Sequence, residues 1–312
     1  MKDVVKTDIN RVSNSKRNRR RQRNNSIYYI IVILLVFGVG ITLSTTLLFN
    51  ISDIEVVGLS QYEEDEIKSA SKVKIGDNLI KTDVNTIKKN VLNTLMYVDD
   101  VRVKKQFPSN LIIEVKPSIP TAMILYENTY LLISENGKIL EKLEEPSRNV
   151  PVIKGFIPAS DIITKNVYWE FSDTNNNDET TGEDFKDDKE RNKALKLICQ
   201  QIKNQNLYSI KEFDISDAYS ISANYQNRIS IRLGNSSELD YKLKYAMQIL
   251  TEQLPTDKEG YLIFRSNNQY QYVSKEDMEK HIEEIAESAG IELQDSQTDE
   301  YIQTSENAEV TG

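Results

Sequence analysis

Residues 97–115 read YVDDVRVKKQFPSNLIIEV and carry the clearest strand pattern in this chain of 312 residues. Apolar and polar residues alternate on both sides of Phe107–Asn110, a four-residue turn with proline at its second position. Period-2 alternation indicates two strands of a sheet that has one covered face. The stretch therefore predicts a β-hairpin whose inner face must be covered by other elements.

The residues before this hairpin supply one more strand and two helices. A short strand that alternates apolar and polar residues ends at Gly58. Ser60 opens a capping-box pattern, which predicts a helix from Gln61 to Ser71. Asp83 is the predicted N-cap of a second helix, whose apolar residues recur at helical spacing. Residues 50–119 are therefore expected to fold as β-α-α-β-β, with the helices covering the sheet.

An uncharged apolar segment, residues 27–49, precedes this module. As a helix it would be roughly 34 Å long, enough to cross a hydrocarbon core of about 30 Å. Residues 1–26 carry nine basic and two acidic side chains, whereas the rest of the chain is acidic. The positive-inside tendency predicts a cytoplasmic tail at 1–26, a transmembrane helix at 27–49 and exported domains after it. Membrane topology accounts for the basic tail, so we expect no nucleic-acid partner.

Residues 120–275 favour short strands in a mixed, mostly antiparallel β domain. Asn136-Gly137 between two apolar runs is a strong hairpin signal. Residues 172–190 are rich in acids and poor in apolar residues, which predicts a flexible acidic insertion. Ser274 is positioned to cap a last helix that runs to about Ala289. Residues 276–312 form an acidic C-terminal tail that we expect to be largely disordered.

The composition excludes several kinds of chemistry. The chain has one cysteine, Cys199, and one histidine, His281, so neither an internal disulfide nor a Cys/His zinc site is possible. It contains no glycine-rich phosphate loop, and the acidic insertion lacks the spacing of a calcium loop. We interpret Cys199 as a packing residue and His281 as an exposed helix residue. No metal, cofactor or catalytic residue is predicted.

An enzyme of the cell-wall surface with paired carboxylates is a second hypothesis. Glu141, Glu144 and Glu145 are candidates, because a glycosidase needs two acids that face one cleft. These glutamates lie on alternating or charged stretches that are typical of solvated faces. We therefore expect no enzymatic activity.

Several motifs in a fixed order carry a family resemblance. They are Ile54–Gly58, Lys74–Leu79, Tyr97–Lys104, Phe107–Val115, Ile231–Gly234 and Gly260–Arg265. Together they resemble the FtsQ/DivIB family of bacterial cell-division proteins over about residues 16–275. The resemblance implies an α+β protein. A single transmembrane helix would be followed by a POTRA (polypeptide-transport-associated) domain and then by the mixed β domain.

The resemblance also implies a function. It suggests a non-catalytic scaffold of the division septum, anchored in the cell membrane with a cytoplasmic N-terminus and extracytoplasmic domains. The expected partners are small single-pass coiled-coil division proteins of the FtsL and FtsB/DivIC type, and no cofactor is implied. A membrane-anchored receptor or sensor at the cell-wall surface is the alternative, and only the identity of the partner distinguishes the two.

Strand addition is the binding mode that we expect. An exposed terminal strand at Gln269–Val273 would offer unpaired backbone groups to a partner segment. The candidate partner-binding residues are Tyr261, Phe264, Tyr270, Tyr272 and Val273, most of which are aromatic anchors. The alternative interpretation is that these side chains simply pack the last hairpin.

Overall fold

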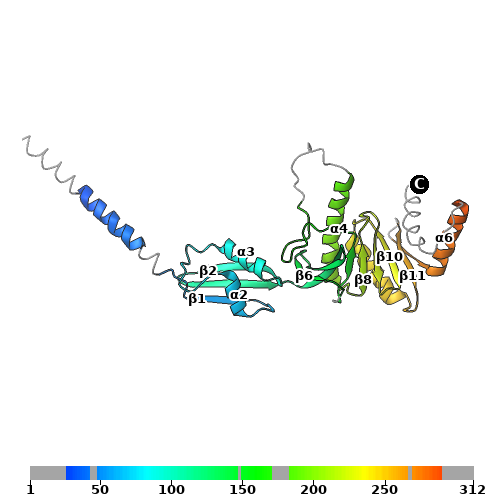
Figure 1. The fold of residues 1–312 in the computed structure, drawn as a ribbon, viewed down its shortest axis with the longest axis horizontal. Coiled ribbons are helices and arrows are strands. Elements are labelled where there is room, and N and C mark those ends of the chain that lie inside the picture. The colour runs from blue at the N-terminus through cyan, green and yellow to red at the C-terminus, as the bar shows by residue number, and fades with distance from the viewer. Residues whose placement is uncertain (1–25, 43–47, 147–148, 171–182, 266–268, 290–312) are drawn as a thin grey trace, which may run out of the picture. The chain divides into compact units, whose positions relative to one another are not determined.

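The structure is a computed structural model that describes residues 26–42, 48–146, 149–170, 183–265 and 269–289 (Figure 1). The chain divides into two compact units. The first unit contains residues 1–57, 64–88 and 102–114, and the second contains residues 58–63, 89–101 and 115–312. The second unit thus includes the end of one helix and the start of the strand that follows it.

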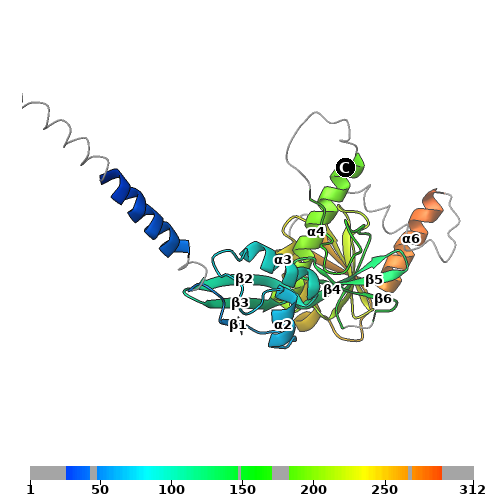
Figure 2. The same cartoon turned by 60° about the vertical axis from the view of Figure 1, so that its left-hand side comes forward.

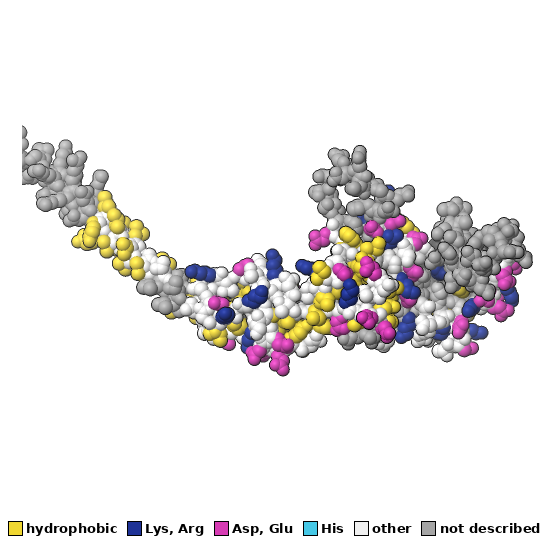
Figure 3. All heavy atoms as spheres, in the orientation of Figure 1, with side chains coloured by type: hydrophobic (Ala, Val, Ile, Leu, Met, Phe, Trp, Pro, Cys, Tyr) yellow, Lys and Arg dark blue, Asp and Glu magenta, His cyan; other side chains and the backbone are white. Residues whose placement is uncertain are grey.

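The apolar segment is only partly helical. Residues 26–42 form a helix with exposed apolar side chains, and Figure 3 shows it as a mainly hydrophobic surface. Among the described residues, no helix combines the length and the apolar character needed to cross a membrane. The predicted helix through Phe49 is too long, because Leu48 and Phe49 lie in a turn and Asn50 forms a β-bridge with Asn78.

The first unit is built on a three-stranded sheet in the order β1-β3-β2. The strands are β1 (Asp53–Val57), β2 (Val98–Gln106) and β3 (Asn110–Pro117). β1 runs parallel to β3, with Ile54 opposite Leu111. Leu111, Ile113 and Val115 are buried while the residues between them are partly exposed, which confirms the predicted alternation.

Two helices join these strands, α2 (Glu64–Ser71) and α3 (Val84–Thr94). The predicted cap of α3 is confirmed, because Asp83 Oδ1 accepts a hydrogen bond from the backbone N–H of Asn85 at 3.1 Å. The predicted start of α2 is wrong by three residues. Ser60 Oγ accepts the N–H of Tyr62 at 3.0 Å, so Ser60 closes a local turn ahead of the helix.

The second unit contains a nine-stranded sheet in the order β12-β11-β10-β9-β8-β7-β4-β5-β6. The strands are β4 (Pro120–Tyr126), β5 (Thr129–Ser134), β6 (Ile139–Leu143), β7 (Val152–Lys154), β8 (Ile210–Asp214), β9 (Ile221–Tyr225), β10 (Ile229–Gly234), β11 (Gly260–Arg265) and β12 (Gln269–Ser274). The pairs β4–β7, β7–β8 and β10–β11 are parallel and the other five are antiparallel. Figure 2 shows β4, β5 and β6 side by side. The predicted mixed, mostly antiparallel sheet is confirmed.

The helices of the second unit are α4 (Glu183–Gln205), α5 (Leu239–Gln248), the π-helical turn η1 (Ile249–Gln253) and α6 (Lys275–Ala289). α4 and α5 lie in the connections of two parallel strand pairs, which need long crossovers. Their buried residues, such as Ile198 and Leu243, share one core with strand residues such as Phe213. α6 packs on β11 through Met278 and Ile282.

Two segments expected to be irregular are helical in part. α4 begins at Glu183, so residues 183–190 of the predicted insertion form its first turns, and the rest of the insertion lies outside the described residues. Ion pairs at helical spacing, such as that of Arg191 with Asp188 at 3.0 Å, support this start. α6 confirms the predicted last helix and occupies the beginning of the segment 276–312 that was assigned to the tail, whereas residues 290–312 lie outside the described residues.

Candidate partner-binding edge

β12 is the last strand of the nine-stranded sheet, and β11 is its only sheet neighbour among the described residues. The two strands are antiparallel, with Tyr261 opposite Val273 and Phe264 opposite Tyr270. α6 follows directly, and its start is fixed by Ser274, whose Oγ accepts the N–H of Asp277 at 3.1 Å. This confirms the predicted cap and leaves the outer side of β12 as an edge.

The register identifies which backbone groups face outward. Gly260 donates its N–H to the carbonyl of Arg228 beside β10 at 3.1 Å. Backbone N–H and C=O groups alternate sides along a strand. Every second residue of β11, starting from Gly260, therefore points these groups toward β10, and the residues between point them toward β12. Ile263 therefore bonds toward its partner Gln271, and the next residue, Tyr272, turns its N–H and carbonyl outward. Tyr270 does the same by the same alternation.

The side chains of Tyr270 and Phe264 point into the unit. Tyr270 donates its hydroxyl hydrogen bond to the carbonyl of Lys242 at 2.9 Å, and its ring centroid lies 5.1 Å from that of Phe264. Burial raises the pKa of Tyr270 above its usual value. These two aromatic side chains therefore pack the hairpin against α5.

The other candidate side chains are distributed over both faces of the hairpin. Tyr272 packs on the main core, and its hydroxyl donates to the carbonyl of Glu259 at 2.8 Å. Tyr261 and Val273 pack on the opposite face, in the small cluster beneath α6. The structure brings Phe264, Tyr270 and Tyr272 together on one side and Tyr261 with Val273 on the other. What the five residues share is the β11–β12 hairpin, of which only β12 is the edge strand, and they do not form one side-chain surface.

A row of aromatic residues beside this edge was missed in the sequence. Tyr241 and Tyr245 of α5 stack with ring centroids 5.9 Å apart, and Tyr245 lies 5.8 Å from Tyr270. Tyr241 is 44 % exposed, so the row leads from the hairpin to the surface. The four-residue spacing of the two tyrosines on a helix was the available signal, because such pairs share a face.

Lys242 supports the hairpin from within. Its ammonium group donates to the carbonyl of Asn235 at 2.9 Å and lies 5.2 Å from the ring centroid of Phe264. Burial lowers the pKa of Lys242 below its usual value, and the nearby charge of Glu238 partly opposes this. The carbonyl of the same residue holds Tyr270, so α5 positions β12 through both backbone and side chain.

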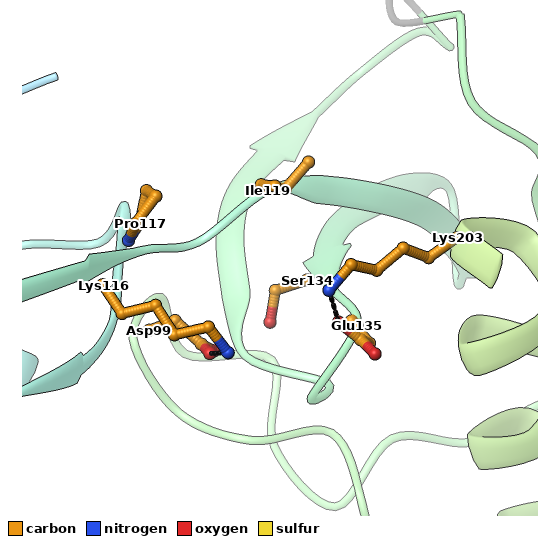
Figure 4. A pocket seen from close by; sticks show the side chains of 7 residues that line it. All are labelled: Asp99, Lys116, Pro117, Ile119, Ser134, Glu135 and Lys203. Carbon is orange, nitrogen blue, oxygen red and sulfur yellow. Dashed lines mark hydrogen bonds and ion pairs between the residues drawn. The ribbon is translucent and has the colours of Figure 1, made fainter. Parts of the chain in front are cut away.

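A small hollow of about 80 Å³ is the one described pocket that Figure 4 shows in detail. Its seven lining residues are Asp99, Lys116, Pro117, Ile119, Ser134, Glu135 and Lys203. Ligand pockets usually enclose several hundred Å³. Both acids are paired, Asp99 with Lys116 at 3.3 Å and Glu135 with Lys203. The hollow is therefore too small for a small-molecule site, and both of its carboxylates are already paired with lysines.

The glutamates, the cysteine and the histidine considered in the sequence analysis do not lie together at one site. Glu141 lies on β6 and accepts a hydrogen bond from the hydroxyl of Tyr97, whereas Glu144 and Glu145 follow the strand and are exposed. Cys199 is fully buried in α4, and His281 is exposed on α6. In the described part of the chain, no three His, Cys, Asp or Glu side chains gather as metal ligands.

Two family models match this chain, one over each of its two sheets. Residues 49–116 match the family model for a POTRA domain of the FtsQ type, and residues 122–273 match that for the C-terminal domain of cell division protein FtsQ/DivIB. The chain belongs to the FtsQ/DivIB family. This confirms the resemblance seen in the sequence and assigns the chain a role in cell division.

Relatives align over most of the chain. Cell division protein DivIB of Clostridium botulinum (strain Hall / ATCC 3502 / NCTC 13319 / Type A) is 29% identical over 236 residues, which cover 73% of this chain and 83% of the relative. DivIB of Clostridium tetani (strain Massachusetts / E88) is 26% identical over 218 residues, covering 69% and 75%. Cell division protein FtsQ of Geobacter sp. (strain M21) is 26% identical over 198 residues, covering 62% and 64%.

Proposed function

We propose that this FtsQ/DivIB family member is a non-catalytic scaffold of the division septum that binds other single-pass division proteins. The expected partners are of the FtsL and FtsB/DivIC type. The observation that carries the proposal is the open outer edge of β12, next to a row of aromatic side chains. An edge strand offers unpaired backbone donors and acceptors that an extended partner segment can complete.

Membrane anchoring is the second part of the proposal. The uncharged segment 27–49 would hold the chain in the cell membrane, with residues 1–26 in the cytoplasm and the folded units outside. The exposed apolar side chains of residues 26–42 support an apolar environment for this helix. Anchoring would raise the effective concentration of the scaffold for partners in the same membrane.

The register of β12 supports strand addition as the proposed binding mode. Tyr270 and Tyr272 direct their backbone groups outward, so a partner strand would pair with these two residues and extend the sheet beyond β12. The six residues of β12 would span about 20 Å, enough for a short extended segment. α5 and α6 lie on opposite faces of the hairpin and could contact whatever flanks that segment.

A proline substitution tests the edge directly. Tyr272→Pro removes the outward N–H, whereas Tyr272→Ala loses the same aromatic ring but keeps the N–H. Each full-length variant would be co-expressed with tagged FtsL-type and FtsB/DivIC-type proteins, and co-purification from solubilised membranes would be measured. We expect the proline variant to lose the partners while the alanine variant retains most of them.

The same experiment can contradict the proposal. Circular dichroism and thermal unfolding must first show that both variants are folded. If the folded Tyr272→Pro variant binds as well as Tyr272→Ala, the outer edge of β12 is not the contact. If the wild-type chain recovers neither partner but recovers a sensor protein, the alternative role as a membrane-anchored receptor replaces the scaffold.

A further inference from the structure

A second surface lies where the apolar segment joins the first unit. Phe49, the last residue of that segment, accepts a hydrogen bond on its carbonyl from the N–H of Leu79 at 2.7 Å. Its ring lies edge-on to that of Phe107, with the centroids 5.7 Å apart. The last residue of the apolar segment is therefore part of the folded unit, so the chain itself links this junction to the proposed anchor.

Three separate pieces of chain meet at this junction. Gly76 of the α2–α3 loop donates its N–H to the carbonyl of Ile51 at 2.8 Å. Ser52 donates its N–H to the carbonyl of Ser109, in the β2–β3 turn, also at 2.8 Å. The segment 49–52, the loop and the turn thus form one end of the unit, which we call the proximal face.

The proximal face exposes an unusual combination of side chains. Its apolar residues are strongly exposed: Leu48 by 62%, Ile75 by 73%, Ile80 by 44% and Phe107 by 58%. Single exposed apolar residues are ordinary, but four at one end of a small unit form a patch. Lys74 and Lys81 lie within the α2–α3 loop, are exposed and have no ion-pair partner among the described residues.

The loop contains two acids, Asp77 and Asp83, and both are already engaged, since Asp83 caps α3. Asp77 Oδ2 accepts a hydrogen bond from the backbone N–H of Lys74 at 2.8 Å. Lys105 also belongs to this end, because its ammonium group donates to the carbonyl of Ile80 at 3.1 Å. The proximal face therefore combines exposed apolar side chains with positive charge, which is the chemistry of an interfacial membrane contact.

We infer that the proximal face docks on the outer surface of the bilayer, with its apolar side chains in the interface and its lysines on anionic lipid phosphates. This inference rests on the proposed membrane anchor. Four side chains alone would bind a membrane weakly, but tethering by the apolar segment converts docking into an intramolecular step. Docking would hold the first unit against the membrane instead of letting it swing freely.

Lipid quenching of a fluorophore on the full-length chain tests this contact. Ile75→Cys and Phe107→Cys would each be labelled with an environment-sensitive dye in chains reconstituted into phosphatidylcholine vesicles, with and without phosphatidylglycerol. Val57→Cys is the matched control, because it is exposed by 42% in the same unit but at the other end of β1. Cys199 does not compete, since it is fully buried and burial raises the pKa of its thiol to about 12.

Brominated lipids should quench the dyes at positions 75 and 107 roughly two-fold or more above position 57. Adding phosphatidylglycerol should increase that difference. A Lys74→Gln, Lys81→Gln double variant should remove most of the increase, because each lysine shifts the docked population by up to about five-fold.

Two failures are distinguishable. If the chain floats with the vesicles but all three positions are quenched equally, docking is overturned while the anchor stands. If the chain does not float with the vesicles, the anchor and the docking fall together. If positions 75 and 107 are shielded only after a division protein is added, without lipid quenching, the proximal face binds protein and the lipid contact is overturned.

Discussion

The two edges of the nine-stranded sheet are treated in opposite ways. At β6, Ile139 donates its N–H to the carbonyl of Lys165 at 2.8 Å and accepts the N–H of Thr164 at 2.8 Å. Val167 adds a hydrogen bond to the carbonyl of Gly137 at 2.9 Å. Residues 164–167 thus form a strap over the start of this edge. At β12, no described residue outside β11 pairs with the strand.

This difference separates a protected edge from an available one. Proteins usually cover or interrupt sheet edges, because unpaired backbone groups promote association with other chains. The strap shows that this sheet can cover the start of an edge with its own loop. An edge left open in the same sheet is consistent with the proposed role of β12 as a surface for a partner strand.

The largest of the predicted effects on stability is expected for Gly260→Ala, beside the open edge. Gly260 has a φ of 148°, and a Cβ there would lie 2.3 Å from the carbonyl oxygen of Val273. Backbone atoms on β12 cannot move away without opening the β11–β12 pair. We therefore expect the free energy of unfolding to fall by about 3 kcal/mol or more. Chemical denaturation and hydrogen exchange at Gln269–Ser274 would measure it.

Gly234→Ala is the control for this prediction. Gly234 also has a positive φ, 66°, but a Cβ there would meet nothing within 4 Å. Gly234→Ala should lower the free energy of unfolding only by the backbone strain, about 1 kcal/mol, and should leave hydrogen exchange at β12 unchanged. Equal losses in the two variants would mean that the close approach at Gly260 is not what holds β12.

The next largest effect is expected at the covered edge, for Lys138→Met. Lys138 precedes β6, is buried, and donates to the carbonyls of Leu92, Leu95 and Val98 at 3.0, 3.0 and 2.6 Å. Methionine keeps much of the volume but leaves these acceptors without their donor. We expect a loss of about 2 kcal/mol in the free energy of unfolding, measured by denaturation at pH 7.

The pH dependence of the free energy of unfolding, compared between the wild type and Lys138→Met, gives an independent check. Burial lowers the pKa of Lys138 from 10.5 to about 8, with the nearby Asp99 partly opposing the shift. Between these two values the unfolded chain holds a proton that the folded protein has released. Stability of the wild type relative to Lys138→Met should therefore rise from about pH 8 to 10.5. A flat difference over this range would contradict the buried, depressed lysine.

A smaller effect is expected for Gly137→Ala, which tests the strap. Gly137 has a φ of 75°, and a Cβ there would lie 2.5 Å from the ring of Tyr168, which must shift. We expect a loss of about 1–2 kcal/mol and faster hydrogen exchange in β6. Partner binding at β12 should not change, because the two edges lie at opposite ends of the sheet. A loss of binding would show that the edges are coupled.

The smallest effect is expected for Lys142→Ala, also on β6. Lys142 pairs with Asp161 at 2.9 Å, and both side chains are well exposed. The hydrogen bond to Asp161 raises the pKa of Lys142, but water and salt screen such pairs. Thermal unfolding should show no measurable change. A clear loss would mean that the strap depends on this ion pair as well as on its backbone hydrogen bonds.

Local features of this chain were predictable from sequence because their causes are local. The alternation around Phe107–Asn110, the Asn136-Gly137 turn and the caps at Asp83 and Ser274 each depend on a few adjacent residues. Errors arose where one local signal competed with another. Ser60 could cap a helix or close a turn, and only the turn formed. Acid-rich residues 183–190 could be irregular or helical, and α4 extended through them.

The candidate edge was half predictable. The last strand was placed correctly at Gln269 onward, but its side chains were expected to point toward a partner. Tyr270 instead bonds to α5, because the register with β11 sends alternate side chains to opposite faces. Tyr241 and Tyr245 joined the site only through the packing of α5, which no local pattern near β12 indicates.

The types of most elements, the motifs of the FtsQ/DivIB family and the resulting role in cell division were all readable in the amino-acid sequence. Which strand became an open edge depended on the assembly of the sheet. The parallel pairs β4–β7, β7–β8 and β10–β11 join segments that are distant in the chain, and the strap from 164 to 167 covers the start of β6 by contacts across a loop. Such pairings depend on global packing, which leaves no short-range periodicity in the sequence.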